Sequence, residues 1–577
     1  MLDAATRRAR LQEGFRWFPG SIGGEVQRQA AAAARAADGL WRRNPAVWSA
    51  DSAVQRTIAN RLGWLGAPRL MAESIDRLLG AADAALRDGF TDMVLLGMGG
   101  SSLAPEVLRA VVGVAPGRPR FHMLDSTDPA AVAAVAPPLA RTLFILASKS
   151  GTTIEPNSLA AHFERGLQRA GVARWADHFI AITDEGTALA ERARAEGFRE
   201  TFINPSDIGG RYSALSYFGL VPAALMGQNV RALVDWALAM LSASQSNVDP
   251  MSNPSVALGL AMAAGARAGR DKLTLVAPRE LEPFGLWAEQ LVAESTGKEG
   301  VGVAPIVGEA PDRPERYGDD RVFVRLALEG GTDPRLDVAG VKAANRPIVE
   351  IDVAEPLALG AEFVRWEIAT AVAGALLRIN PFDEPNVQQA KDATRVLLEE
   401  YKTKGSLPIP PPDRTLGEGV TLRLTSAARR DLHGRGPEAL LTLLTERDYF
   451  SLLAYLGPDK ELAEALHGLR MHVRDRTHAA TMSGYGPRYL HSTGQLHKGG
   501  PNTGVFVLIT ASPHADLPIP GEAFSFGTLE MAQALGDFAS LDATGRRAVQ
   551  VHLPAPDPQL LRLVGDSLLA GIERSSR

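Results

Sequence analysis

The chain has 577 residues, of which 45% are hydrophobic and 22% are charged, as in ordinary globular proteins. A chain of this length is too long for one hydrophobic core and is expected to form about three or four domains. A net charge of −5 argues against a surface that binds nucleic acid or anionic membranes, and the lack of cysteine excludes disulfides, thiolate nucleophiles and cysteine-ligated metals.

The N-terminal residues MLDAATRRAR have no apolar stretch behind their arginines, as a secretory signal would have. An apolar run at 357–379 contains Glu362, Arg365 and Glu367, which does not suit a membrane span. We therefore expect a cytoplasmic protein with no membrane partner.

Residues 1–90 are expected to form a helical N-terminal segment, because apolar positions such as Ile75, Leu78 and Ala82 recur at helical spacing. From residue 91 short apolar runs alternate with amphipathic helices, a pattern typical of a parallel sheet covered on both faces. The first such domain is expected over 91–243. Its predicted elements are strands at 93–97, 121–124, 142–148 and 178–183 and a helix at 155–169.

The polar, turn-rich segment at 244–254 opens a second unit of the same kind, expected over 244–405. A stiff linker is expected at 406–414, which contains the proline-rich run LPIPPP, and a third α/β domain over 415–577. In these two units the predicted strands are 273–278, 322–328, 347–353, 420–426, 505–510 and 548–554, and the predicted helices are 356–379, 459–477, 527–541 and 558–574.

The loop after the predicted strand at 142–148 reads SKSGTT, at 148–153, and leads into a helix near Glu155 and Pro156. Parallel sheets bind ligands at the carboxyl ends of their strands. The hydroxyl groups, backbone N–H groups and helix N-terminus of this loop together suit a phosphate. A Ser/Thr-rich turn that only caps the helix is the alternative from these residues alone.

GMGGSS at 97–102 also joins a strand to a helix, and Asp125 ends the next strand as a ribose-binding acid would. The third glycine of a dinucleotide fingerprint falls on Ser102, which weakens that interpretation. What remains is a tight turn, either close to a small ligand or purely structural. ESTGKEG at 294–300 lacks the leading glycine and final Ser/Thr of a nucleotide-binding loop, and the histidines form no ligand-like cluster, so no metal is expected.

Several motifs occur in the order and approximate spacing seen in phosphoglucose isomerases: GMGGS at 97–101, SKSGTT at 148–153, DIGGRYSALS at 207–216, EQLVAESTGK at 289–298 and NPFDEPNVQQAK at 380–391. The chain resembles that family over about residues 90 to 395. The resemblance implies an α/β fold with two sugar-isomerase (SIS) domains, each a parallel sheet with flanking helices. It also implies the interconversion of glucose 6-phosphate and fructose 6-phosphate, with a phosphorylated hexose as substrate and no cofactor.

The resemblance assigns Glu294 as the base that moves a proton through an enediol(ate), and Arg211 as the fixed cation that stabilises the developing charge. Lys391 matches a lysine that assists ring opening. The implied binding residues are Ser148, Ser150 and Thr153 for the phosphate, with Lys149 and Thr152 nearby, and Gly100, Ser101 and Gln290 for the sugar.

Two features depart from the family pattern. Glu384 stands where many relatives have glutamine, which places an additional carboxylate near Glu294 and could raise a neighbour's pKa. The family's histidine, often donated by the partner subunit, is missing from its usual place, because residues 299–379 contain no histidine. The nearest match is STGQLHKGGPNTG at 492–504, so His497 is the first candidate for ring opening and His491 the second.

The relocated histidine motif and the long C-terminal extension resemble the isomerase half of bifunctional transaldolase/phosphoglucose isomerases. No eightfold βα pattern precedes residue 90, so transaldolase activity is not predicted. The alternatives are a SIS-type sensor that binds a phosphosugar without turnover, a related phosphoglucose/phosphomannose isomerase, and an NAD-dependent dehydrogenase that uses Asp125. A sensor needs neither Glu294 nor Arg211, which favours an isomerase. A homodimer is expected from the family alone.

Overall fold

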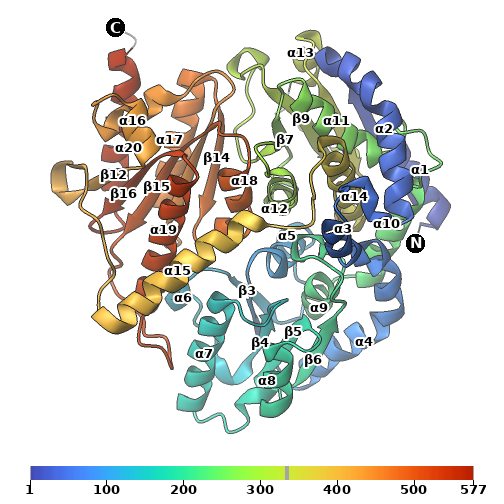
Figure 1. The fold of residues 1–577 in the computed structure, drawn as a ribbon. Helices are drawn as coiled ribbons and strands as arrows, with labels where there is room; N and C mark the ends of the chain where they lie inside the picture. The colour runs from blue at the N-terminus through green and yellow to red at the C-terminus, as the bar shows by residue number, and fades with distance from the viewer. Residues whose placement is uncertain (1, 332–336, 576–577) are drawn as a thin grey trace.

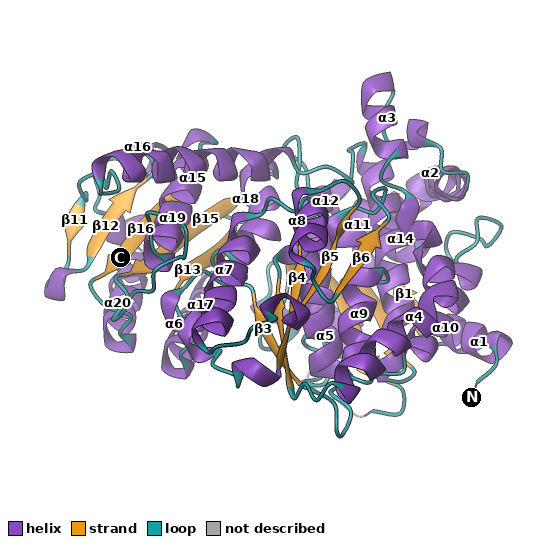
Figure 2. Ribbon diagram, turned by 90° about the horizontal axis from the view of Figure 1, so that it is seen from below, coloured by secondary structure: helices purple, strands orange, loops and turns teal. Residues whose placement is uncertain are grey.

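The computed structural model describes residues 2–331 and 337–575, and within them the strands form three separate sheets (Figure 1). Each sheet is flanked by helices, as Figure 2 shows. One apolar core is shared by the sheets of the first and second domains, another covers the other face of the first sheet, and a third lies against the third sheet. The fold class predicted from the sequence, α/β with two parallel-sheet domains and a third α/β domain, is confirmed.

The first sheet has the strand order β3-β2-β4-β5-β6, and every neighbouring pair is parallel. Its central strands are buried along their whole length, as expected for a sheet with helices on both faces. The strands are β2 (Asp92–Leu96), β3 (Arg120–Leu124), β4 (Thr142–Ala147), β5 (Phe179–Asp184) and β6 (Glu200–Asn204). The helices of this part are α4 (Ala67–Arg87), α5 (Leu103–Val111), α6 (Pro129–Ala134), α7 (Ile154–Arg169), α8 (Ala188–Glu196) and α9 (Tyr217–Leu225).

The second sheet has the order β1-β10-β9-β7-β8 and is parallel except for β1, which pairs antiparallel with β10 at one edge. The strands are β1 (Phe15–Phe18), β7 (Lys272–Val276), β8 (Ala304–Ile306), β9 (Arg321–Leu328) and β10 (Ile348–Val353). The helices are α1 (Ala4–Glu13), α2 (Gly23–Trp41), α3 (Ser52–Ala59), α10 (Val230–Ala243), α11 (Val256–Arg267), α12 (Phe284–Thr296), α13 (Val338–Ala343) and α14 (Leu359–Leu377). The N-terminal segment is therefore helical except for β1, which the sequence pattern did not predict.

The apolar run at 357–379 forms α14, which packs among α2, α10, α11 and α12 inside the protein. Two of its charged residues, Glu362 and Arg365, form a buried ion pair of 2.9 Å, and burial raises the pKa of Glu367 well above its ordinary value, which favours the uncharged form. In the described part of the chain, no helix combines the length and the apolar character needed to cross a membrane.

The third sheet has the order β11-β12-β16-β15-β13-β14, with a parallel core from β16 to β14 and an antiparallel edge. The strands are β11 (Arg414–Thr415), β12 (Thr421–Leu424), β13 (Tyr449–Tyr455), β14 (Ala480–Tyr485), β15 (Gly504–Ala511) and β16 (Arg547–Leu553). The helices are α16 (Ser426–Asp431), α17 (Lys460–Thr477), α18 (Gly494–Gly499), α19 (Phe526–Ala543) and α20 (Pro558–Ser575). We call residues 414–575 the third unit.

Helix α15 (Pro385–Lys404) connects the second sheet to the third unit and crosses the molecule as the yellow helix of Figure 1. The sequence grouping placed it with the second domain, but it packs against α18 and α19 of the third unit. The proline-rich run after Gly405 has no regular structure until β11 begins at Arg414. The helix therefore holds the third unit beside the other two sheets.

Candidate functional site

A cavity of about 550 Å³ lies at the carboxyl ends of β2 and β4, where the three units meet. It is lined by residues of every motif that resembles the isomerase family and by one residue of the third unit, among them Gly100, Ser101, Ser148, Lys149, Ser150, Thr153, Arg211, Gln290, Glu294, Glu384, Lys391 and His491. The structure thus brings together all but two of the predicted site residues: Thr152 lines only an adjoining cavity, and His497 lies elsewhere.

The SKSGTT loop is a compact turn between β4 and α7. Gly151 adopts a left-handed backbone conformation with φ of +69°, and its N–H donates to the hydroxyl of Ser148 at 3.1 Å. Ser148 in turn donates to Thr153 at 3.2 Å, while Ser150 and Thr152 bond to each other at 3.1 Å at the open side. The hydroxyl groups are therefore gathered beside the N-terminus of α7, an arrangement suited to an anion.

Lys149 is held at the cavity wall rather than pointing freely into it. Its Nζ pairs with the carboxylate of Asp184 and donates to the carbonyl of Ser206 at 2.9 Å. The side chain contributes positive charge next to the loop, but its hydrogen bonds are already made within the protein.

The glycines of GMGGS permit a close approach between two loops. A Cβ added at Gly100 would lie 2.0 Å from the carbonyl oxygen of Gly210, in the GGRYS turn that carries Arg211. Ser213 of the same turn donates to the carbonyl of Gly100 at 3.2 Å. Gly100 therefore lets the first loop pack directly on the backbone that positions Arg211.

Glu294 projects from α12, a helix that contacts α14, α5 and α18 and so lies between all three units. One turn earlier, Gln290 donates to Glu294 at 3.2 Å and to the backbone carbonyl of His491 at 2.7 Å. The helix spacing of four residues places both side chains on the same face. The carboxylate of Glu294 is thereby oriented at the cavity surface.

The guanidinium of Arg211 is fixed by bonds on all of its nitrogens. Nε donates to Ser295 at 2.8 Å, and Nη2 donates to the backbone carbonyls of Pro381 and Asp383 at 2.9 and 2.7 Å. Nη1 pairs with Glu294 at 3.2 Å and with Glu384 at 3.0 Å. The side chain is a buried, immobile cation directly beside the predicted base.

Burial raises the pKa of Glu294 above the ordinary carboxyl value. Arg211 opposes this rise, whereas the neighbouring carboxylate of Glu384 adds to it. A carboxylate with a raised pKa is a stronger base than an exposed one, and this is the chemistry required to remove a proton from carbon.

The two candidate histidines occupy different environments, and of the two only His491 lies at the cavity. His497 is 2% exposed and packs against Tyr449 and Phe506, with its Nδ1 3.0 Å from the Tyr449 hydroxyl. It does not line the cavity, and burial lowers its pKa well below the ordinary value, so that it stays uncharged. His497 belongs to the interior of the third unit.

His491, the second candidate, lines the cavity. Its Nε2 lies 3.0 Å from Oε1 of Glu155, and the same oxygen accepts a hydrogen bond of 2.8 Å from Gln533. Against the opposing effect of burial, His491 holds the pKa of Glu155 below its usual value, so that the carboxylate remains charged beside the imidazole. Glu155 was recognised in the sequence only as part of a helix start, although it stands two residues after the SKSGTT loop.

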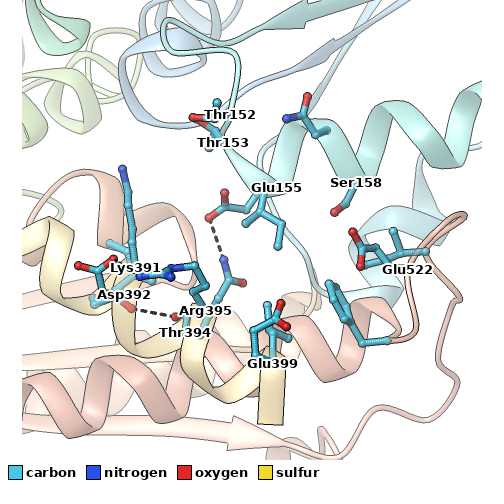
Figure 3. A pocket seen from close by; sticks show the side chains of 18 of the residues that line it. Thr152, Thr153, Glu155, Ser158, Lys391, Asp392, Thr394, Arg395, Glu399 and Glu522 are labelled. Atoms are coloured by element: carbon cyan, nitrogen blue, oxygen red, sulfur yellow. Dashed lines mark hydrogen bonds and ion pairs between the residues drawn. The ribbon is translucent and has the colours of Figure 1, made fainter. Parts of the chain in front are cut away.

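Lys391 projects from α15 toward the same region and also lines an adjoining cavity of about 720 Å³. Figure 3 shows this second cavity, with Thr152, Thr153 and Glu155 on one side and Lys391, Asp392 and Arg395 of α15 on the other. The two cavities share Ser150 and Thr153 of the SKSGTT loop, Lys391 of α15 and His491. Among the residues that the structure describes, no group of three or more acidic or histidine side chains could hold a metal ion.

Comparison with known proteins shows which family this chain is similar to. The phosphoglucose isomerase family model matches residues 73–304. A glucose-6-phosphate isomerase of Thermosynechococcus vestitus is 32% identical over 54% of this chain and 66% of its own length, and one of Cyanothece sp. is 30% identical over 54% and 67%. A third, from Synechococcus sp., is 29% identical over 64% of this chain and 79% of its own length.

Solved structures share the fold. A hypothetical protein of Thermus thermophilus superposes with a TM-score of 0.55 at 23% identity, over 66% of this chain and 99% of the other. A glucose-6-phosphate isomerase from Chlamydia trachomatis gives a TM-score of 0.51 at 18% identity, over 68% and 91%. The chain belongs to the phosphoglucose isomerase family.

Proposed function

We propose that the protein is an aldose–ketose isomerase that interconverts glucose 6-phosphate and fructose 6-phosphate. The observation that carries this proposal is the contact between Glu294 and Arg211 at a cavity that also contains the SKSGTT loop. A buried carboxylate base, a fixed cation and an anion-binding loop are the parts that this reaction requires.

The phosphate of the substrate binds the hydroxyl and N–H groups of residues 148–153, with Lys149 nearby. Binding this remote group fixes the sugar carbons against Glu294 and so lowers the entropic part of the barrier. Gly100, Ser101 and Gln290 contact the sugar from the neighbouring turn and from α12.

The ring of the sugar opens before isomerisation, which needs a proton donor for the ring oxygen. His491 takes this role in place of His497, because it lines the cavity and is oriented by Glu155. Lys391 lies at the same side of the site and binds the sugar oxygens.

In the open chain, in the direction from glucose 6-phosphate to fructose 6-phosphate, Glu294 removes the proton from C2 and returns it to C1, while the proton of the C2 hydroxyl passes to the C1 oxygen. The electrons of the broken C–H bond pass to the carbonyl oxygen and form an enediolate, whose charge is stabilised by Arg211. Because Arg211 is already held by Ser295 and two backbone carbonyls, little reorganisation accompanies this step.

The test is a coupled assay with fructose 6-phosphate, comparing the wild type with Glu294→Gln. The substitution preserves shape and hydrogen bonding but removes the base, so turnover is expected to fall by about 10²- to 10⁴-fold. If Glu294→Gln retains near-normal turnover, this mechanism is wrong. Binding of the phosphosugar without turnover by the wild type would instead identify a sensor.

Two wider expectations belong to this proposal. We place the enzyme in the cytoplasm, where its phosphorylated substrate is found. A homodimer, as expected from the family, is a further prediction, which sedimentation measurements can decide.

A further inference from the structure

His491 reaches the cavity from the third unit, on a short 3₁₀ turn formed by Arg488–His491. Both ends of this turn are attached to the first sheet domain. At its start Arg488 binds Asp125, and at its end His491 binds Glu155. The position of the imidazole therefore depends on how the third unit is seated against the first domain.

The Arg488–Asp125 contact is bidentate. Nε donates to Oδ2 and Nη2 donates to Oδ1, each at 2.7 Å. Asp125 is 3% exposed, and its Oδ2 also accepts a hydrogen bond from Ser102 at 3.2 Å. Paired bonds between a planar guanidinium and a carboxylate fix orientation as well as distance. Asp125, which in the sequence resembled a ribose-binding acid, thus joins the GMGGSS turn to the third unit.

The turn is also held from the side of the third unit, through Tyr489. The hydroxyl of Tyr489 donates to Asp537 at 2.6 Å, and Asp537 forms a fully buried ion pair of 2.5 Å with Lys498 of α18. The turn therefore moves with the third unit and cannot adjust alone. Its position against the first domain is set by the contacts of Arg488 with Asp125 and of His491 with Glu155.

A third contact attaches the turn to the second sheet domain. The backbone carbonyl of His491 accepts a hydrogen bond of 2.7 Å from Gln290, which also bonds to Glu294. The same residue thus connects the base on α12 to the chain that carries the imidazole. All of these contacts lie within one chain.

We infer that Arg488 and Asp125 are positioning residues that seat the third unit so that it supplies His491 to the active site of its own chain. The third unit takes the place that a partner subunit fills when it donates the histidine. This inference rests on the proposed isomerase function and adds to it that one chain contains a complete site.

The first test compares Arg488→Met with Arg547→Met. Arg547 is a matched control, because it also binds a buried carboxylate with two bonds, to Asp448 at 3.0 Å each, but inside the third unit. Each variant is assayed for turnover of fructose 6-phosphate, for inhibition by the acyclic enediolate analogue 5-phosphoarabinonate, and for its melting temperature.

Arg488→Met is expected to lower kcat by about 10- to 100-fold, because a small displacement of His491 impairs ring opening. Inhibition by the acyclic compound should be unchanged, since it needs no ring opening and binds the phosphate loop, Glu294 and Arg211. Arg547→Met should lower the melting temperature and leave kcat intact. Normal kcat in Arg488→Met, or equal losses of kcat in both variants, would overturn the inference.

If Arg488→Met does not fold, Arg488→Lys and Asp125→Asn provide the same comparison. Lysine keeps the charge but loses the second bond, so its kcat should lie between those of the wild type and Asp125→Asn. Wild-type kcat in both would also contradict the positioning role. Absence of isomerase activity in the wild type would contradict the proposed function instead.

The second test asks whether the histidine acts within its own chain. Glu294→Gln and His491→Asn are co-expressed so that mixed oligomers can form. Activity no higher than that of the two variants alone is expected for a site within one chain. Recovery of about a quarter of wild-type activity, the fraction for random pairing in a dimer with shared sites, would overturn the inference.

Discussion

Glu384 binds the same nitrogen of Arg211 that pairs with the predicted base, Glu294. The two carboxylates lie 3.0 and 3.2 Å from Nη1, so one cation is shared between two negative charges. The groups that face Glu294 are Arg211, Lys298, Glu384 and His491, and of these only Glu384 raises its pKa. A glutamine at this position would form the hydrogen bond without the charge.

The first prediction concerns this shared cation. Glu384→Gln should lower the pKa of Glu294, because the repulsive carboxylate is removed while Arg211 remains. The base must be ionised to act, so activity is lost as the pH falls through its pKa. The acidic limb of the kcat/KM profile should therefore move to lower pH. An unchanged profile would contradict this coupling. Glu446→Gln, an exposed loop substitution with the same charge change, is the control.

The two histidines provide the second prediction. His491→Asn should lower turnover of fructose 6-phosphate by about 10²-fold or more and leave the melting temperature nearly unchanged. His497→Gln should lower the melting temperature and leave turnover nearly unchanged. It disturbs a buried aromatic cluster and the hydrogen bond to Tyr449 but no substrate contact. Equal activity losses in the two variants would contradict the assignment of His491. The measurements are steady-state kinetics and thermal unfolding.

Glu155 is predicted to act through His491. Glu155→Gln removes the charge that orients the imidazole of His491, and we expect kcat to fall by about 10- to 100-fold with little change in KM. Glu164→Gln, on the same helix but paired with Arg192 and outside both cavities, should have normal kinetics. If Glu155→Gln alters only the stability, Glu155 has a structural role alone.

The fourth prediction uses the contact between the GMGGS and GGRYS turns. Gly100→Ala should displace the loop that holds Arg211 and abolish most activity, because its Cβ would lie 2.0 Å from the carbonyl oxygen of Gly210. Gly210→Ala, with no atom within 4 Å of the added Cβ, should retain the wild-type melting temperature. A fully active and stable Gly100→Ala variant would show that the two turns can separate.

Much of the fold could be predicted from the sequence because its strands are nearly all apolar. The segments at 93–97, 142–148 and 178–183 are buried on both faces, so their composition alone identifies them. β1 was missed because it is a four-residue edge strand whose pairing with β10 joins residues more than 300 positions apart. The packing of α15 against α18 and α19 could not be predicted for the same reason, since it joins distant parts of the chain.

Residues that lie within one motif could be named from the sequence, and the structure places most of them together. Glu294, Arg211 and four residues of the SKSGTT loop line the cavity. The sequence favoured His497 because it lies in the motif-like STGQLHKGG, whereas the contact of His491 with Glu155 joins distant parts of the chain. No local sequence pattern could show that His497 is buried beside aromatic side chains while His491 lies at the cavity.

The adjoining cavity of about 720 Å³ has a consequence for inhibitor design. It begins at Thr152, Thr153 and His491 and continues along α15 past Arg395 to Lys402. A compound anchored by a phosphate mimic on the SKSGTT loop can therefore carry an extension into a groove formed partly by the third unit. Because that wall comes from the C-terminal part of the chain, the extension offers selectivity over isomerases that are built from two sheet domains alone.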